Sequence, residues 1–360
     1  MTIDEKNILW LDLFENLAYN KKSKLLEIAG RNKDIRKIFL TNDLIKQVVS
    51  QEEFNKMSLC LQDSFLDLKL KSYEQENIIP ITFYNENYPY LLKQIPNPPF
   101  CLYCKGNIQL LNTFCIGVVG SRRTTDYGVV TTKQFTKDLV NADVTIVSGL
   151  ASGVDTIAHK TAIEQSGKTI AVIAGGLHHI YPAINAGLAR TITENNLIIS
   201  ENMPDVSPQS YLFPIRNRII AGLSKGVLIT EAGEKSGALY TIEYAIDYGR
   251  EIFVVPGKIN SEMSKGTNNL IKKYAGSIVL SSDNILEVFN LKTKEISKNS
   301  AVQLDIGVQL VLDYISAEKK TFQEILDYTK FSAKDLNTIL QELELAGLVQ
   351  KFANNSYIQL

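Results

Sequence analysis

The sequence predicts an α/β fold built on a doubly wound, mostly parallel β-sheet, and three observations support this prediction. Short runs rich in β-branched residues recur between residues 115 and 285. These runs are continuously apolar, which is typical of strands that are buried on both faces. Helical patterns separate them, and glycines follow many of their ends, where such sheets bind ligands. The predicted strands are Ile116–Val119, Thr145–Ser148, Thr169–Ala174, Leu197–Ser200, Val227–Thr230, Ile252–Val255 and Ile278–Leu280.

The chain before this region falls into two parts. Residues 1–77 carry helix-spaced apolar residues and a single glycine, so we expect a small all-α domain. Prolines cluster between residues 78 and 106, which predicts a linker with one short helix and short strands. Cys101 and Cys104 have the spacing of a metal or redox pair. Since no second pair completes a zinc site and their run is strand-like, we interpret both as structural.

The chain after the central region also falls into two parts. Residues 291–303 are polar and predict a linker, and residues 304–360 give three helical patterns and two terminal strands, the order of a winged-helix-like domain. Ser332 with Asp335 is expected to cap the third helix, and Gly347 to end it. That helix carries three acidic residues and one lysine, a poor match to a phosphate backbone. We therefore interpret this domain as a protein-contact or packing module.

The composition indicates a globular protein, with 45% hydrophobic and 21% charged residues and a net charge of -1. This balance argues against a globally basic protein, so any nucleic-acid surface must be a local patch. The N-terminal stretch lacks a signal-peptide pattern, and no apolar run approaches the ~20 residues of a membrane span. We expect a cytoplasmic protein without a membrane partner, in which the four cysteines stay free thiols.

The stretch from Cys115 to Arg123 predicts a phosphate site. A buried strand stops at Gly120 and turns into a helix that is expected to run from about Thr125–Asp126 to Asn141. Backbone N–H groups and the positive helix end would point at one spot beside Arg122 and Arg123, and such a spot attracts phosphate. The residues expected to face inward are Val129, Val130, Phe135 and Leu139.

Three familiar motifs are incomplete, so we expect no catalytic residue, no metal and no cofactor. Gly117-x-x-Gly120 lacks one of the three glycines and the acidic partner of the dinucleotide fingerprint. Residues 166–169 keep the Gly-Lys-Thr of a phosphate loop but lead from a helix into a strand, the reverse of that motif. Residues 149–153 place their serine one position too late for a nucleophile elbow. The histidines, which we interpret as structural, are His159, His178 and His179.

A second cluster of aromatic and basic residues offers a way to hold both phosphate and base. Pro214 at the first position of a helix would leave Arg216 and Arg218 near its first turn, aimed at the helix mouth. Aromatic faces stack unpaired bases while arginines hold the backbone. The alternative is a surface helix whose arginines pair with Glu201 or Glu231, and spacing alone does not decide between the two. The members of the cluster are Tyr211, Phe213, Arg216, Asn217 and Arg218.

These motifs resemble the DprA/Smf family over roughly residues 80–285, in the family's order. One departure is Tyr274, where the family usually has a glycine, and we expect it to reshape that turn rather than the binding edge. The segments that carry the resemblance are GVVGSRRTTDYG (117–128), SGLASGVDTIAH (148–159), TIAVIAGGLHHIYPAIN (169–185), SENMP (200–204), FPIRNRIIAGLS (213–224), SGALYT (236–241), VPG (255–257) and GTNNLI (266–271).

The resemblance implies an extended Rossmann-like domain at residues 78–290, flanked by an N-terminal helical (SAM-like) domain and a C-terminal winged-helix-like domain. It implies a non-catalytic mediator of natural transformation and competence. Such a protein binds and protects incoming single-stranded DNA, loads the RecA recombinase onto it for homologous recombination, and forms a homodimer through the Rossmann-like domain. By motif, the DNA-binding residues would be Gly120, Ser121, Arg122, Lys168, Phe213, Arg216, Asn217 and Arg218.

The rival hypothesis is an enzyme, a Rossmann-like nucleoside-monophosphate phosphoribohydrolase. Enzymes of that type carry a PGGxGTxxE turn, and residues 237–243 lie at a similar turn with Thr241 and Glu243. The leading Pro-Gly-Gly is absent, and the spacing from threonine to glutamate is one residue short. A third possibility is a purely structural scaffold for RecA, against which the two aromatic residues beside the arginines argue.

Overall fold

The computed structural model describes residues 1–14, 17–274, 277–292, 306–316, 318–346, 348–352 and 354–359. The chain forms two compact units, Met1–Lys292 and Thr293–Leu360. The predicted linker at residues 291–303 lies outside the described residues from position 293 onward. Among the described residues, no helix is both long enough and apolar enough to cross a membrane.

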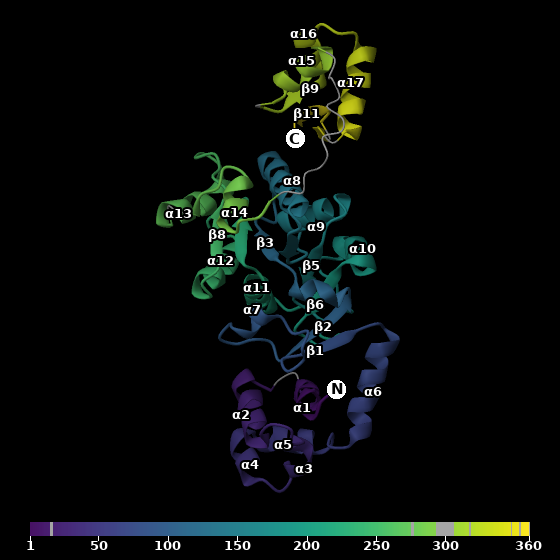
Figure 1. Cartoon of the computed structure of the whole chain (residues 1–360), viewed down its shortest axis with the longest axis vertical. Coiled ribbons are helices and arrows are strands. Elements are labelled where there is room, and N and C mark those ends of the chain that lie inside the picture. Colours follow the sequence, from purple (N-terminus) through teal and green to yellow (C-terminus); the bar gives the residue numbers. More distant parts are fainter. Residues whose placement is uncertain are drawn as a thin grey trace. The chain divides into compact units, whose positions relative to one another are not determined.

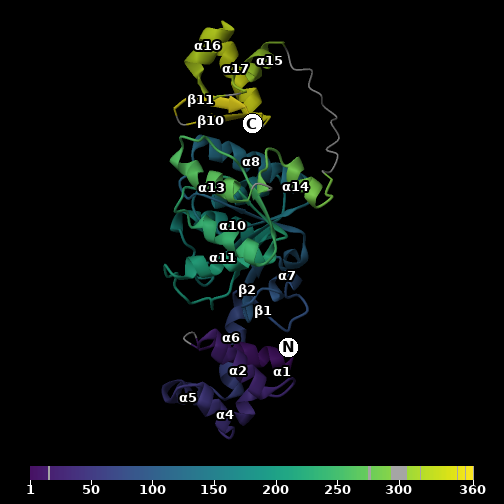
Figure 2. The ribbon, with the colours of Figure 1, turned by 90° about the vertical axis from the view of Figure 1, so that its left-hand side faces the viewer.

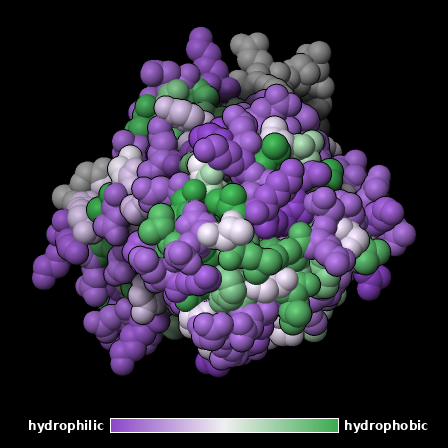
Figure 3. All heavy atoms as spheres, turned by 90° about the horizontal axis from the view of Figure 1, so that it is seen from below, coloured by the Kyte–Doolittle hydropathy of each residue, from purple (hydrophilic) through white to green (hydrophobic). Residues whose placement is uncertain are grey.

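The first unit begins with a helical module, residues 1–77. Its core surrounds Trp10, which is fully buried and packs edge-on against Phe39 at 5.4 Å between ring centroids. Some large apolar side chains stay outside, with Leu59 83% and Leu68 67% exposed. Figure 3 shows apolar residues gathered on the face at this end of the molecule. The helices are α1 (Ile3–Asp12), α2 (Tyr19–Ala29), α3 (Ile35–Ile38), α4 (Asp43–Val48), α5 (Gln51–Ser58) and α6 (Asp63–Gln75).

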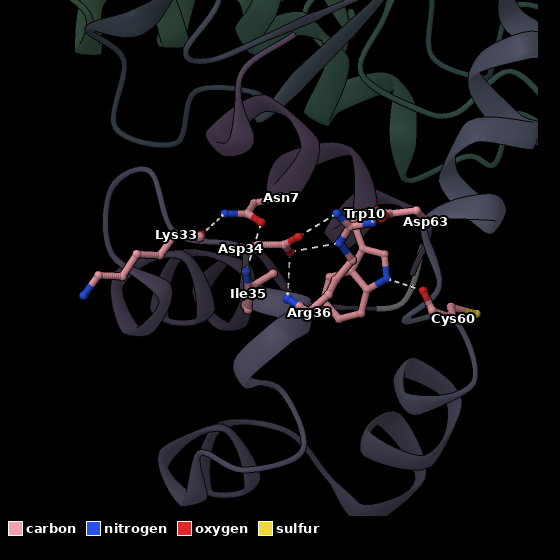
Figure 4. Close-up of polar contacts among 8 residues, drawn as sticks. All are labelled: Asn7, Trp10, Lys33, Asp34, Ile35, Arg36, Cys60 and Asp63. Carbon is pink, nitrogen blue, oxygen red and sulfur yellow. Dashed lines mark hydrogen bonds and ion pairs between the residues drawn. The ribbon is translucent and has the colours of Figure 1, made fainter.

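Polar contacts fix the turns between these helices (Figure 4). The Asn7 side chain donates to the Lys33 carbonyl at 2.8 Å and accepts from the Ile35 amide at 3.1 Å, so it holds the turn that enters α3. Trp10 Nε1 donates to the Cys60 carbonyl at 2.7 Å. Arg36 joins α3 to the start of α6 through a 2.6 Å ion pair with Asp63. These long-range bonds fasten connections that apolar contacts alone would leave free.

An eight-stranded sheet forms the centre of the first unit, in the order β1-β2-β6-β5-β4-β3-β7-β8 (Figures 1 and 2). The six strands from β6 to β8 in this order run parallel, which confirms the predicted mostly parallel sheet. The strands are β1 (Ile79–Thr82), β2 (Cys101–Gly106), β3 (Cys115–Val119), β4 (Thr145–Ser148), β5 (Thr169–Val172), β6 (Leu197–Ser200), β7 (Gly226–Ile229) and β8 (Glu251–Val254).

Two sequence-based expectations differ at the sheet's edges. The proline-rich stretch holds strands, as predicted, but β2 pairs antiparallel with β6 and so extends the main sheet. Cys101 and Cys104 lie in β2 as buried free thiols. The predicted strand Ile278–Leu280 is reduced to one bridge, between Ile278 and Val254. Leu280 is 75% exposed, so this segment has too little apolar burial to extend the ladder further.

Helices cover both faces of the sheet, because alternate residues of each strand point to opposite sides. The helical elements are α7 (Tyr90–Lys93), η1 (Ile108–Asn112), α8 (Asp126–Asn141), α9 (Val154–Glu164), η2 (Ala183–Asn185), α10 (Ala186–Asn195), α11 (Leu212–Leu223), α12 (Ala238–Asp247), η3 (Glu262–Ser264), α13 (Lys265–Lys273) and α14 (Asp283–Val288). Ile116 and Val118 of β3 pack on one face with α8 and α9, the helices after β3 and β4. Val119 packs on the other face with α11 and α12, the helices after β6 and β7.

Helix α8 begins and ends where the sequence predicted. Thr125 caps it, accepting from the Gly128 amide at 3.2 Å. Phe135 and Leu139 face inward as expected, whereas Val129 and Val130 are only partly buried. The buried face also holds Thr132, whose hydroxyl lies 2.7 Å from that of Thr230 in the sheet. A hydrogen-bonded threonine thus takes a core position that the apolar pattern alone did not reveal.

The described residues of the second unit form three helices and a three-stranded antiparallel sheet in the order β10-β11-β9. Ser332 caps α17 by accepting from the Asp335 amide at 3.1 Å, as predicted, while Gly347 lies outside the described residues. The assignment of this unit as winged-helix-like stays a prediction. Its elements are α15 (Ile306–Tyr314), β9 (Lys320–Thr321), α16 (Phe322–Thr329), α17 (Ala333–Leu345), β10 (Val349–Phe352) and β11 (Ser356–Gln359).

Candidate nucleic-acid interface

A cleft of about 830 Å³ lies at the carboxyl ends of the central strands. The turn from β3 into α8 forms one wall, the start of α11 forms another, and residues 233–238 with η3 close the remaining side. The strand order reverses between β3 and β7, so the cleft occupies the switch point at which doubly wound sheets bind ligands. Six of the predicted DNA-binding residues line it, namely Gly120, Ser121, Arg122, Phe213, Arg216 and Asn217.

The turn after β3 depends on the glycine at position 120. A Cβ atom there would lie 2.5 Å from Val154 Cγ2 and 2.8 Å from the Glu231 carbonyl oxygen. The next residue, Ser121, donates its amide to that Glu231 carbonyl at 2.7 Å. Its hydroxyl accepts from the Arg123 amide at 3.0 Å and donates to the Arg123 carbonyl at 2.9 Å. Gly120 and Ser121 therefore shape the turn, and the Ser121 amide is already bonded.

Glu231 follows β7, and its side chain binds the N-terminal end of α8. Its side chain accepts from the Thr125 amide at 2.9 Å and from the Thr125 hydroxyl at 2.5 Å, and the residue is 1% exposed. The sequence treated this helix end as an open phosphate site and Glu231 as an alternative arginine partner. The Glu231 carboxylate therefore interacts with the positive end of α8 in place of a bound anion. The basic side chains must then supply most of the cleft's attraction for phosphate.

A chain of cationic and aromatic side chains crosses the mouth of the cleft. The exposed guanidinium of Arg122 lies 5.4 Å from the centroid of the Phe213 ring, within range of a cation–π contact. Phe213 in turn meets Tyr181 edge-on, with 5.4 Å between ring centroids. Tyr181 is 51% exposed and lines the cleft. The sequence analysis did not select Tyr181, although an aromatic residue close after a strand-end Gly-Gly pair was the available signal.

Arg216 forms the floor of the cleft. It is buried, and its Nη1 donates to the Gly149 carbonyl at 2.7 Å and to the Val172 carbonyl, which joins the ends of β4 and β5. Burial lowers the pKa of Arg216 to about 10, against the effect of the nearby Asp155 carboxylate. Burial also raises the pKa of Asp155, and Arg216 opposes that rise. Arg216 thus acts first as a strut between two strand ends.

Arg218 and Lys168 lie elsewhere. Pro214 is the third residue of α11, not the first as predicted, and residues two apart on a helix point in nearly opposite directions. Arg218 consequently faces a second cleft of about 470 Å³ and pairs with Glu201, one of the two partners that the alternative interpretation named. Lys168 precedes β5 at the opposite edge of the sheet and pairs with Asp143 at 3.1 Å.

Two further sequence-based expectations concern His159 and Tyr274. His159 is fully buried in α9, and its Nδ1 lies 2.7 Å from the Thr169 hydroxyl, consistent with a structural role. Burial lowers the pKa of His159 to about 3. Tyr274 ends α13 and does not line the described cleft, while residues 275 and 276 of the turn that follows lie outside the described residues.

The fold and cleft define a doubly wound α/β protein with a basic and aromatic ligand site at its switch point. The profile of the family described as "DNA recombination-mediator protein A" matches residues 80–290. The chain is 42% identical to the DNA processing protein DprA of Bacillus subtilis over 215 residues, which cover 59% of this chain and 72% of that protein. The chain belongs to this DprA/Smf family.

Two solved structures are similar to this chain. The X-ray structure of DprA from Streptococcus pneumoniae has a TM-score of 0.62 and 32% identity, covering 80% of this chain and 98% of that one. A structure of DNA processing protein A from Helicobacter pylori, described as giving insight into its single-stranded DNA binding mode, has a TM-score of 0.53 and 34% identity. It covers 57% of this chain and 94% of that one.

Proposed function

We propose that this protein binds single-stranded DNA in the cleft at the carboxyl ends of β3, β4 and β7. The observation that carries the proposal is the row Arg122, Phe213 and Tyr181, which sets an exposed cation over the Phe213 ring and a second aromatic ring edge-on beside it. Single-strand binding proteins combine a basic path for the backbone with aromatic rings on which bases stack. The similar Helicobacter pylori protein, described as binding single-stranded DNA, supports the same ligand.

The residues of the cleft divide the work between them. Arg122 holds a phosphate from the rim, and Phe213 and Tyr181 offer surfaces for a base. Asn217, whose amide donates to the Gly237 carbonyl at 3.2 Å, keeps the opposite wall in place. Gly120 and Ser121 shape the turn that carries Arg122, and Arg216 supports the floor, where its charge adds to the attraction for phosphate. Lys168 and Arg218 are assigned to DNA binding only by the family resemblance.

The binding role is preferred to the hydrolase. Glu243, which would be the catalytic carboxylate, lies on the exposed side of α12 and is not among the described residues that line the cleft. Thr241 does line the cleft but is 1% exposed. Glu243 therefore does not lie where it could act as acid or base on a ligand in the cleft, whereas the basic and aromatic side chains there are suited to holding one.

The wider role follows from the family rather than from the cleft. We infer that the protein acts in the cytoplasm on DNA taken up in natural transformation, protects it, and loads RecA onto it without consuming a nucleotide. Homodimerisation would go through the Rossmann-like domain at residues 78–290. The winged-helix-like unit at residues 304–360 would contact protein rather than DNA, since α17 carries Asp335, Glu342 and Glu344.

Fluorescence anisotropy at several salt concentrations tests the proposal. The full chain should bind labelled oligo-dT much more tightly than thymidine monophosphate, because a strand offers several phosphates and stacked bases, each base worth roughly 1–3 kcal/mol. It should also prefer oligo-dT to duplex DNA. A RecA strand-exchange assay should show stimulation. Release of free base from nucleoside monophosphates, lost on Glu243→Ala and without RecA stimulation, would favour the hydrolase instead.

A further inference from the structure

One loop of the first unit touches both the helical module and the cleft. It follows β5 and carries His178 at one end and Tyr181 at the other. The His178 ring contacts Glu76, the residue that ends α6, through Nε2, while its Nδ1 lies 2.9 Å from Asp205 Oδ1. Lys69 of α6 also pairs with Asp205, at 3.2 Å. Three residues after His178, Tyr181 packs against the aromatic side of the cleft.

The backbone of this loop is held firmly to the neighbouring loop after β6. The Gly176 amide donates to the Val206 carbonyl at 2.7 Å, and the His178 amide donates to the Pro204 carbonyl at 3.1 Å. A Cβ atom at position 176 would lie 2.0 Å from the Met203 carbonyl oxygen, so the two loops touch closely. Between the two ends of the loop, Ile180 packs against a buried cluster formed by residues of β5, β6 and α10. Only two residues separate His178 from Tyr181 in this closely held loop, so we expect a shift at His178 to move Tyr181.

The contact has two states that differ by one proton. A neutral imidazole can donate through only one ring nitrogen, whereas an imidazolium donates through both. Since Glu76 and Asp205 face the two nitrogens, only the imidazolium satisfies both contacts. Partial burial lowers the pKa of His178, but the hydrogen bonds to Glu76 and Asp205 outweigh it, so this pKa is raised. The other charged or titratable groups that α6 brings here are Lys69 and Tyr73.

We propose that the loop from Gly176 to Tyr181 couples the helical module to the DNA cleft, with His178 as a positioning residue that sets Tyr181. The inference rests on the function proposed above, because it describes regulation of the same site. When His178 holds both carboxylates, Tyr181 is fixed beside Phe213, and a strand loses less freedom on stacking against fixed rings. When the proton is lost, one contact breaks and Tyr181 is held less firmly. Contact of α6 with this loop thus sets the affinity of the cleft for single strands.

The test is the affinity of the full chain for labelled oligo-dT between about pH 6 and about pH 8, the range in which histidines titrate. In the unaltered chain, affinity should fall about fivefold as pH rises through the raised pKa of His178. His178→Gln should remove the fall and bind weakly throughout. Tyr181→Ala should also flatten the profile. Glu74→Gln, which removes an exposed carboxylate at the same end of α6 that is not a described partner of His178, is the matched control and should keep the original profile.

Glu76→Gln gives a second, independent readout. It keeps the size of the side chain but removes a charge that raises the pKa of His178, so the fall in affinity should move to lower pH. The coupling is refuted if oligo-dT binds but the profiles of His178→Gln and Glu76→Gln match that of the unaltered chain; the proposed function then stands. If the unaltered chain binds no oligo-dT at any pH, the proposed function itself fails.

Discussion

Replacing Arg122 by glutamine removes a charge that lies at the rim of the cleft beside the Phe213 ring. Arg122 is exposed, and its described contact is the Phe213 ring at 5.4 Å. An exposed cation–π contact is worth about 0.5–1 kcal/mol, so Arg122→Gln should lower the free energy of unfolding by about 1 kcal/mol or less. The effect on folding should therefore be small.

The effect on binding should be larger, because the ligand contact is charged. A hydrogen bond to a charged group contributes about 1.5–3 kcal/mol, which corresponds to a loss of roughly tenfold to a hundredfold in affinity. Losing one phosphate contact on a single strand should also lower the slope of log affinity against log salt by about 0.7. The two effects should appear together, since both come from the same contact.

The measurement is a set of oligo-dT titrations at several salt concentrations, with thermal melts of each variant. Arg190→Gln is the matched control, because Arg190 is an exposed arginine on α10 that does not line the cleft. Arg190→Gln should change the net charge by the same amount as Arg122→Gln but leave the slope of log affinity against log salt unchanged. If Arg122→Gln keeps both affinity and slope while melting normally, or if Arg190→Gln lowers them as much, Arg122 does not hold a phosphate.

Three further predictions concern the floor, the core and the second unit. Arg216→Ala leaves the Gly149 and Val172 carbonyls without their donor and Asp155 without its nearby positive charge, so the free energy of unfolding in urea should fall by about 3–5 kcal/mol. Asn217→Ala should lower it by about 1 kcal/mol. Similar losses in the two variants would contradict the structural role of Arg216. The pKa of His159 falls from an ordinary 6.5 to about 3 on burial, so stability should drop as pH falls below 6.5. The drop should reach about 1.4 kcal/mol per pH unit and be flattened by His159→Gln; an unchanged slope in that variant would contradict it. A chain ending at Lys292 should keep most of its affinity for oligo-dT, and loss of binding by a folded chain would move the DNA site into the second unit.

The sequence was informative wherever local pattern decides structure. Continuous β-branched runs located the parallel strands because burial on both faces leaves no polar alternation. Thr125 marked the start of α8 because a side-chain cap is a local signal. The turn at Gly120 was equally visible, since only glycine fits against Val154 and Glu231.

The rest depended on contacts between distant residues. Glu231 lies more than a hundred positions from Thr125 in the chain, and no local rule announces that it closes the helix end. Arg216 and Arg218 point to different sides of α11, because residues two apart on a helix do not face each other. This difference could have been foreseen if the start of α11 had been placed correctly. The His178 contact with Glu76 joins two modules, so only the folded chain reveals it.

Photo-crosslinking tests the central claim, that single-stranded DNA occupies this cleft, most directly. Oligo-dT carrying iodouracil reacts with nearby aromatic side chains, and the attached peptides can be identified by mass spectrometry. The cleft model predicts crosslinks at Phe213 and Tyr181, both lost under excess unlabelled oligo-dT and weakened in Arg122→Gln. Specific crosslinks confined to the helical module or to residues 306–359, with none at Phe213 or Tyr181, would contradict it.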